Sequence, residues 1–173
     1  RWDSGQFLMG ELIKARIYKQ KIYKLEDRFI KSIKDSITSL QISDPFFLAK
    51  LLTIPGLSEL ESLFDKVDPI SIYKESLSFE GSIADKILND LRILSENLLL
   101  KINLTWPLGK GERKLLGIIW FYMALAGDEK VIRNCVDSIV DSSMTISRAA
   151  LEALKPLDSS ETKEASNLFY DTW

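Results

Sequence analysis

The sequence predicts an all-α protein: a helical bundle with a long N-terminal helix, a second long helix and several short helices. Apolar residues recur three or four positions apart along most of the chain, which is the spacing of one helix face. Proline and glycine gather in short clusters that end these segments. No pair of strand-like segments flanks a hairpin turn. With 173 residues, the chain can bury a core without metals or disulfides.

The first predicted helix covers residues 7–40, because no proline interrupts its apolar stripe and Gly10 is its only weak point. At 1.5 Å per residue it would be about 50 Å long. A compact domain of this size is only about 40 Å across, so we expect this helix to protrude, break or pack against a partner chain. The stripe consists of Leu8, Leu12, Ala15, Tyr18, Ile22, Leu25, Phe29, Ile33, Ile37 and Leu40.

Short helices follow. Asp44 and Pro45 favour a helix start, and Pro55-Gly56 ends that helix. A capping box is predicted at Ser58 and Glu61, and Asp68-Pro69 is a second Asp-Pro start. After the glycine in "FEG", the second long helix is predicted to open at Ser82 or Asp85, with an apolar face of Ile83, Ile87, Leu91, Leu94, Leu98 and Ile102.

The clearest break is "TWPLGKG", residues 105–111. It divides the chain into an N-terminal region, 1–104, and a C-terminal helical subdomain, 105–173, unless the two form one continuous domain. Four helices are predicted beyond it: 112–126 ended by Gly127, one from Asp128 to about Val140, one from Thr145 to about Leu154, and a terminal helix opened by a capping box of Asp158 and Glu161.

Positive charge is concentrated near the start of the chain. Residues 1–41 contain nine basic and five acidic residues, net +4, whereas the whole chain is net −2. On a continuous helix the main cations form one stripe opposite the apolar face. This stripe has three interpretations: a solvated surface, a surface for a protein partner, or a surface for nucleic-acid phosphates. Its members are Lys14, Lys21, Lys24, Arg28 and Lys31.

The stretch "LGKGERK" does not have the spacing of a phosphate-binding loop. Its cations nevertheless stand in the first turn of a helix, where the helix dipole disfavours positive charge and a bound anion would relieve it. The candidate anion site is Lys110, Arg113 and Lys114.

The last part of the chain has the outline of a helix-turn-helix. "TISRAALEAL" would be its recognition helix, with Thr145, Ser147 and Arg148 near the exposed start. The turn lacks the glycine that is often found there, and few basic residues accompany it. An ordinary helical hairpin is therefore the competing interpretation.

The composition excludes several chemistries. No histidine is present, and a single cysteine, Cys135, precludes a structural zinc site or an internal disulfide and fits a reducing, cytoplasmic location. The longest apolar run, residues 115–126, is too short to cross a membrane. We expect no cofactor and no catalytic activity. The predicted function is a helical subunit or adaptor of a larger, possibly nucleic-acid-processing, assembly, with a protein partner or a second copy; the alternative is a nucleic-acid-binding protein.

Overall fold

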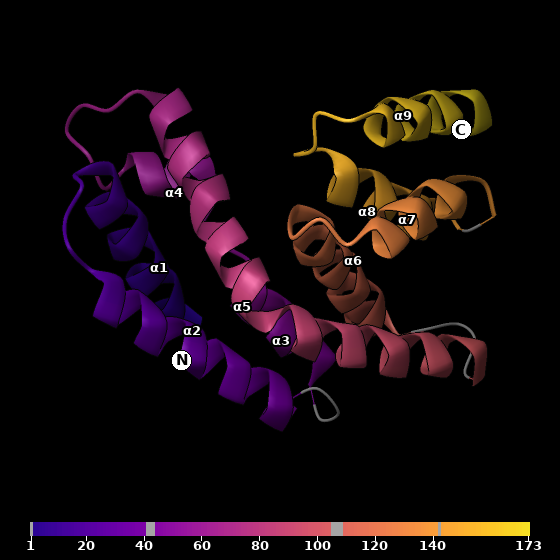
Figure 1. Ribbon diagram of the computed structural model, residues 1–173, viewed down its shortest axis with the longest axis horizontal. Helices are drawn as coiled ribbons and strands as arrows, with labels where there is room; N and C mark the ends of the chain where they lie inside the picture. Colours follow the sequence, from indigo (N-terminus) through magenta and orange to yellow (C-terminus); the bar gives the residue numbers. More distant parts are fainter. Residues whose placement is uncertain (1, 41–43, 105–108, 142) are drawn as a thin grey trace.

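The computed structural model describes residues 2–40, 44–104, 109–141 and 143–173. Every regular element in these ranges is a helix, which confirms the all-α class. In the view of Figure 1, α1, α2 and α4 lie to the left of the first half of α5, α3 lies near its middle, and α6 to α9 lie to its right. Their bounds are α1 Trp2–Ile17, α2 Tyr23–Leu40, α3 Pro45–Leu52, α4 Leu57–Glu61, α5 Pro69–Leu104, α6 Lys110–Leu125, α7 Glu129–Asp141, α8 Met144–Leu154 and α9 Ser160–Thr172.

The predicted continuous N-terminal helix is wrong, because the chain breaks between α1 and α2. Lys19 adopts a left-handed conformation with φ 54°. Its amide donates to the carbonyl of Arg16, and the amide of Gln20 donates to that of Ala15, which is the hydrogen-bond pattern of a Schellman helix end. The break lets two shorter helices pack against α5 in place of one rod that would overhang the domain.

Arg16, near the end of α1, links this helix to the two helices packed beside it. Its guanidinium lies 2.9 Å from the carboxylate of Glu26 on α2 and 3.5 Å from that of Glu75 on α5. Two residues that the predicted stripe placed on the apolar face, Tyr18 and Leu25, are exposed instead. The stripe members that are buried, Leu12 and Ala15 on α1 and Phe29, Ile33 and Ile37 on α2, thus reach the core from two helices. Residues outside the predicted stripe join them there: Met9 and Ile13 on α1, and Ile30 on α2.

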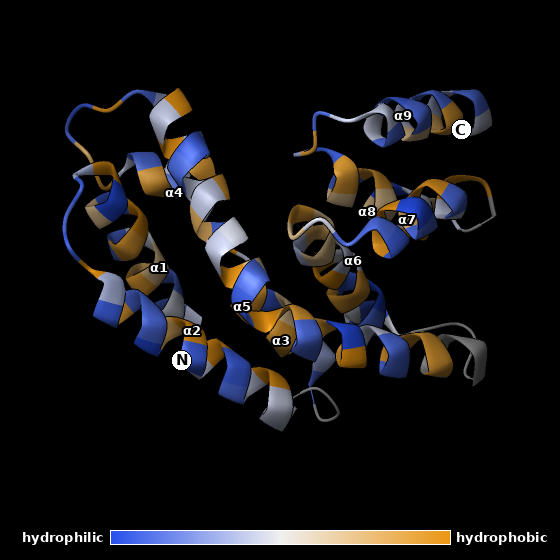
Figure 2. Ribbon diagram, in the orientation of Figure 1, coloured by the Kyte–Doolittle hydropathy of each residue, from blue (hydrophilic) through white to orange (hydrophobic). Residues whose placement is uncertain are grey.

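The second long helix is longer than predicted. It begins at Pro69 rather than near Ser82, and it passes through Gly81 without interruption. Asp68 caps its start, since its carboxylate accepts from the amides of Ile70 and Ser71. α5 changes direction partway along its length (Figure 1), and hydrophobic and hydrophilic residues alternate around it (Figure 2). Its buried apolar residues are Ile72, Phe79, Ile83, Ala84, Ile87, Leu91, Leu94 and Leu98.

The capping residues were predicted with mixed success. Asp44 caps α3 through a 2.8 Å bond from the amide of Phe47, as expected. Asp128 likewise accepts from an amide in the first turn of α7. The caps of three other helices lie one or two residues earlier or later than predicted: Gly56 for α4, Ser143 for α8 and Ser159 for α9.

The buried residues form one connected cluster that runs from Met9 on α1 to Ala165 on α9. α6 is central to it, because this helix packs against α3 and α5 on one side and α8 on the other. The predicted division near residue 105 stays a prediction; the core includes residues from both sides of it. No helix within the described ranges combines the length and the apolar character needed to cross a membrane.

Candidate functional site: a cavity between α5, α6 and α8

A cavity of about 980 Å³ opens where α5, α6 and α8 meet the end of α3. The close approach of α6 and α8 forms one wall. A Cβ atom added to Gly117 on α6 would lie 3.0 Å from the Cβ of Ala149 on α8, so this glycine allows the two helices to touch. Apolar side chains, including Leu77, Ile118 and Phe121, line much of the interior.

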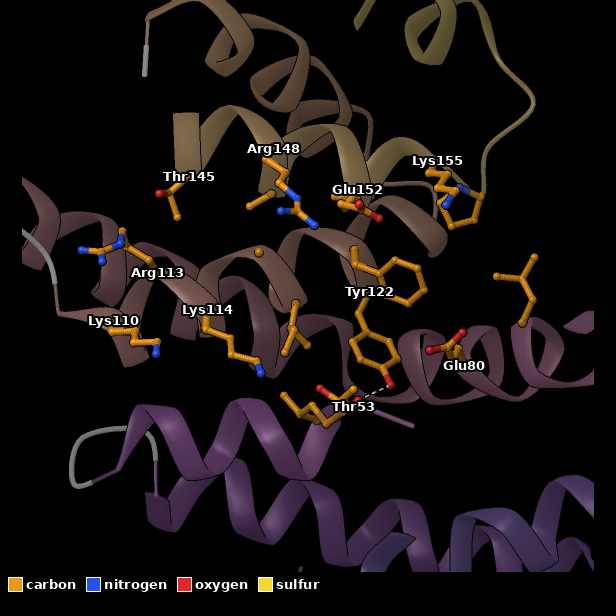
Figure 3. A pocket seen from close by; sticks show the side chains of 18 of the residues that line it. Thr53, Glu80, Lys110, Arg113, Lys114, Tyr122, Thr145, Arg148, Glu152 and Lys155 are labelled. Carbon is orange, nitrogen blue, oxygen red and sulfur yellow. Dashed lines mark hydrogen bonds between the residues drawn. The ribbon is translucent and has the colours of Figure 1, made fainter. Parts of the chain in front are cut away.

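Cations from two helices face this cavity. Lys110 and Lys114 come from the first turns of α6, and Arg148 comes from α8 across the opening (Figure 3). Arg148 is exposed and makes no hydrogen bond or ion pair with any described residue. Lys110 and Lys114 belong to the predicted anion site, and Arg148 belongs to the predicted recognition helix. The structure places residues from these two separate predictions at one cavity, which neither prediction included.

Arg113, the third member of the predicted anion site, also lines the cavity. Its side chain extends away from Lys114 and Arg148 in the close-up, so the three cations of α6 do not converge (Figure 3). Lys114 is additionally held 5.5 Å from the ring centroid of Phe46 on α3. The anion site as predicted therefore stays a prediction, with Lys110 and Lys114 as the members that face the cavity.

Sequence reasoning missed Glu80. It lies on α5, half-buried, and its carboxylate points into the cavity from the side opposite Lys110 (Figure 3). No hydrogen bond or ion pair joins it to any described residue. Burial raises its pKa from 4.5 to about 8, because an ionised carboxylate loses hydration there. No local motif could have indicated this, since the burial comes from helices distant in the sequence.

Tyr122 forms the floor beside Glu80. Its ring is fully buried, and its hydroxyl donates a 2.7 Å hydrogen bond to the carbonyl of Leu52, at the last turn of α3 (Figure 3). This bond satisfies a carbonyl that has no partner within its own helix. Burial, and secondarily the charge of Glu80, raise the pKa of the Tyr122 hydroxyl well above its ordinary value. Tyr122 is therefore a structural donor and stays protonated.

The remaining predicted recognition residues have different surroundings. Ser147 is fully buried, and its hydroxyl donates to the carbonyl of Ile139 on α7 at 2.9 Å. Thr145 and Arg148 line the cavity. α8 packs against α6, α7 and α9, so Ser147 tightens a helical hairpin and is turned away from any ligand.

The predicted basic stripe is divided by the break after α1. Lys14 is on α1 and lies 5.9 Å from the ring centroid of Phe64, Lys21 is in the connection, and only Lys24, Arg28 and Lys31 share α2, where all three are exposed. The stripe as a continuous surface is therefore wrong. Use of the three α2 cations by a partner stays a prediction.

Metal and thiol chemistry find little support in the described ranges. No group of three or more acidic or cysteine side chains is arranged there to hold a metal ion. Burial raises the pKa of the Cys135 thiol to about 12, so this side chain behaves as a small apolar residue rather than a nucleophile.

The described residues thus form a helical fold with a cavity of about 980 Å³ between α5, α6 and α8. The chain belongs to the family described as "Domain of unknown function (DUF3458_C) ARM repeats", whose model matches residues 1–173. It is 29% identical over 94 residues to aminopeptidase N of Escherichia coli (strain K12), a match that covers 53% of this chain and 11% of that protein.

The fold is also that of part of a solved aminopeptidase. The structure of Legionella pneumophila aminopeptidase A in complex with aspartic acid matches 100% of this chain with a TM-score of 0.79, at 22% sequence identity and over 21% of its own length. The chain thus spans a small part of both relatives. These findings overturn the predicted role in a nucleic-acid-processing assembly and the alternative of a nucleic-acid-binding protein, because the similar proteins are aminopeptidases.

Proposed function

We propose that this chain is a non-catalytic helical domain of a larger aminopeptidase. The observation that carries the proposal is the match of the whole chain to about a fifth of aminopeptidase A, 21% of that protein's length. The sequence similarity to aminopeptidase N, over 11% of its length, supports the same assignment.

The absence of histidine supports the non-catalytic part of the proposal. Histidine is the most common general base and a frequent metal ligand, and the 173 residues contain none. The chemistry would then reside in another part of the protein. The helical domain would contribute surface, stability or access to substrate.

Exposed apolar side chains support a neighbouring protein surface. Ile93 and Leu100 lie on the second half of α5 and are about 60% exposed, at 60% and 61%. The two positions are seven residues apart and so share one face of the helix, and a contiguous apolar face is the kind of surface that contacts another protein. We assign this face to contact with the rest of the peptidase; the predicted protein partner or second copy stays a prediction.

The test uses an antibody raised against the 173-residue chain on extracts of the source cells. We expect a single polypeptide far larger than 19.7 kDa, together with hydrolysis of aminoacyl-coumarin substrates by the immunoprecipitate. Fractionating the same cells tests the predicted cytoplasmic location. A polypeptide of about the chain's own mass, free of peptidase activity, would refute the proposal.

A second assay tests whether the chain itself is catalytic. The purified chain should release no coumarin from these substrates with or without added zinc, while Escherichia coli aminopeptidase N, as the positive control, does. Turnover that rises in proportion to the amount of chain would show that the chain itself is catalytic.

A further inference from the structure

The cavity between α5, α6 and α8 has cations at one end and the carboxyl group of Glu80 at the other. Lys110, Lys114 and Arg148 stand on one side, and the carboxylate of Glu80 stands on the other (Figure 3). Apolar and aromatic side chains lie between them, among them Ile118. A ligand that fits this distribution has a negative end, an uncharged middle and a positive end.

Glu80 is the member of this set that comes from α5. Its carboxyl is half-buried, faces the cavity and has no partner among the described residues. The hydroxyl of Tyr122, whose side chain lies beside Glu80 in Figure 3, already donates to the carbonyl of Leu52. An ammonium group placed in the cavity would favour the ionised form of Glu80 and pair with it, and charge-assisted hydrogen bonds of this kind are among the stronger polar contacts. Glu152 of α8 adds a second carboxylate at the lining.

The cationic side suits a carboxylate. Arg148 and Lys114 project from two different helices that face each other across the opening, so a carboxylate between them would be held from both sides (Figure 3). Guanidinium groups bind carboxylates through paired hydrogen bonds. Two further cations line the cavity among the described residues. Arg113 extends away from Lys114 and Arg148 (Figure 3), and Lys155 is exposed at the end of α8, where solvent screens its charge.

We propose that this cavity binds a short peptide with free termini, its amino group at Glu80 and its carboxylate at Lys114 and Arg148. The volume of about 980 Å³ is at the upper end of the range of about 300–1,000 Å³ for small-molecule sites, which suits several residues rather than a single amino acid. The inference rests on the proposed function only for the choice of a peptide over other zwitterions of similar length.

The test is calorimetric titration of the 173-residue chain with tetra-alanine in three forms: unblocked, N-acetylated and C-amidated. We expect the unblocked peptide to bind. Acetylation should weaken binding about tenfold because it removes the charge that pairs with Glu80, and amidation should weaken it about tenfold because it removes the carboxylate.

Variants assign each end of the peptide. In the Glu80→Gln variant, acetylating the peptide should reduce its affinity by less than about twofold, because the partner of its amino group is already gone. In the Arg148→Gln variant, amidating the peptide should change its affinity much less than in the unchanged protein, whereas acetylating it should weaken binding as before. Exposed residues outside the cavity provide matched controls: Glu96→Gln on the same helix as Glu80, and Lys130→Gln on α7. Thermal melting confirms that each variant is folded.

Three results would overturn the proposal: no heat of binding at up to about 10 mM peptide, equal affinity for all three peptide forms, or blocking effects of the same size in the variants and the controls. None of these would bear on the proposed function, which the antibody experiment tests without any added peptide. Conversely, the predicted coupling between Glu80 and acetylation would stand even if the source polypeptide were small.

Discussion

Replacing Glu80 with glutamine should stabilise the protein at neutral pH and remove part of its pH dependence. The folded state holds the Glu80 proton more tightly than the unfolded chain does, because burial raises the pKa from 4.5 to about 8. The neutral carboxyl therefore contributes its full stability below pH 4.5. That stability is lost as the pH rises from there through about 8, the folded-state pKa.

The size of the effect follows from these two values. Between the unfolded pKa of 4.5 and a working pH of about 7, each pH unit corresponds to about 1.4 kcal/mol. Ionisable Glu80 should therefore cost at most about 3 kcal/mol at pH 7, since the cavity gives solvent some access to the carboxyl. Glutamine keeps the shape and polarity of the protonated acid without this cost.

Urea denaturation followed by circular dichroism measures the difference. The free energy of unfolding of Glu80→Gln should exceed that of the unchanged protein by less than about 1 kcal/mol at about pH 5. At about pH 7 the difference should reach up to about 3 kcal/mol. Glu96→Gln, at an exposed position of the same helix, should show almost no such trend. A Glu80→Gln difference that stays constant across this range would refute the claim that the Glu80 carboxyl is desolvated in the folded state.

Four further substitutions test the packing by the same denaturation assay. Gly81→Ala should stabilise the folded protein by about 1 kcal/mol, because alanine is the better helix former and an added Cβ meets nothing within 4 Å. A destabilised variant would contradict the continuity of α5 at this position. Gly111→Ala should destabilise by about 1–3 kcal/mol, because its Cβ would lie 3.0 Å from a backbone nitrogen of α3; a neutral result would mean that α3 and α6 are less tightly apposed. Tyr122→Phe should cost about 1–3 kcal/mol by leaving a buried carbonyl of α3 unpaired, and a cost near zero would exclude that hydrogen bond. Ser147→Ala should lower the free energy of unfolding by about 1 kcal/mol, because it removes the hydrogen bond to Ile139. Thr145→Ala, at an exposed position, should change it very little, and equal effects would contradict the structural role of Ser147.

The candidate site was only partly predictable. Sequence patterns singled out Lys110 and Lys114 from an oddity of charge at a helix start, and Arg148 from the outline of a helical hairpin. Both patterns are local, so each could be seen in the sequence alone. Glu80 was missed because its surroundings are not local: α6 and α8 bury a carboxyl that looks like any surface glutamate within its own segment.

The N-terminal region shows the limit of periodicity. An apolar stripe over residues 7–40 fits a continuous helix and also fits two helices joined by a tight turn, because both keep the same local spacing. Three features favour the break. Arg16 forms ion pairs with α2 and α5, each half of the segment packs against α5, and Lys19 adopts a left-handed conformation at the turn. Gly81 shows the converse, since packing carries α5 through a residue that weakens a helix only modestly.

The sequence by itself determined that this protein is helical and where most of its helices begin and end, since helix periodicity, caps and prolines act over a few residues. Only the tertiary structure decided which helices are continuous, which cations meet across the cavity and which carboxyl is buried opposite them. Those properties depend on contacts between residues far apart in the chain, and their free energies outweigh the small local preferences that a sequence displays.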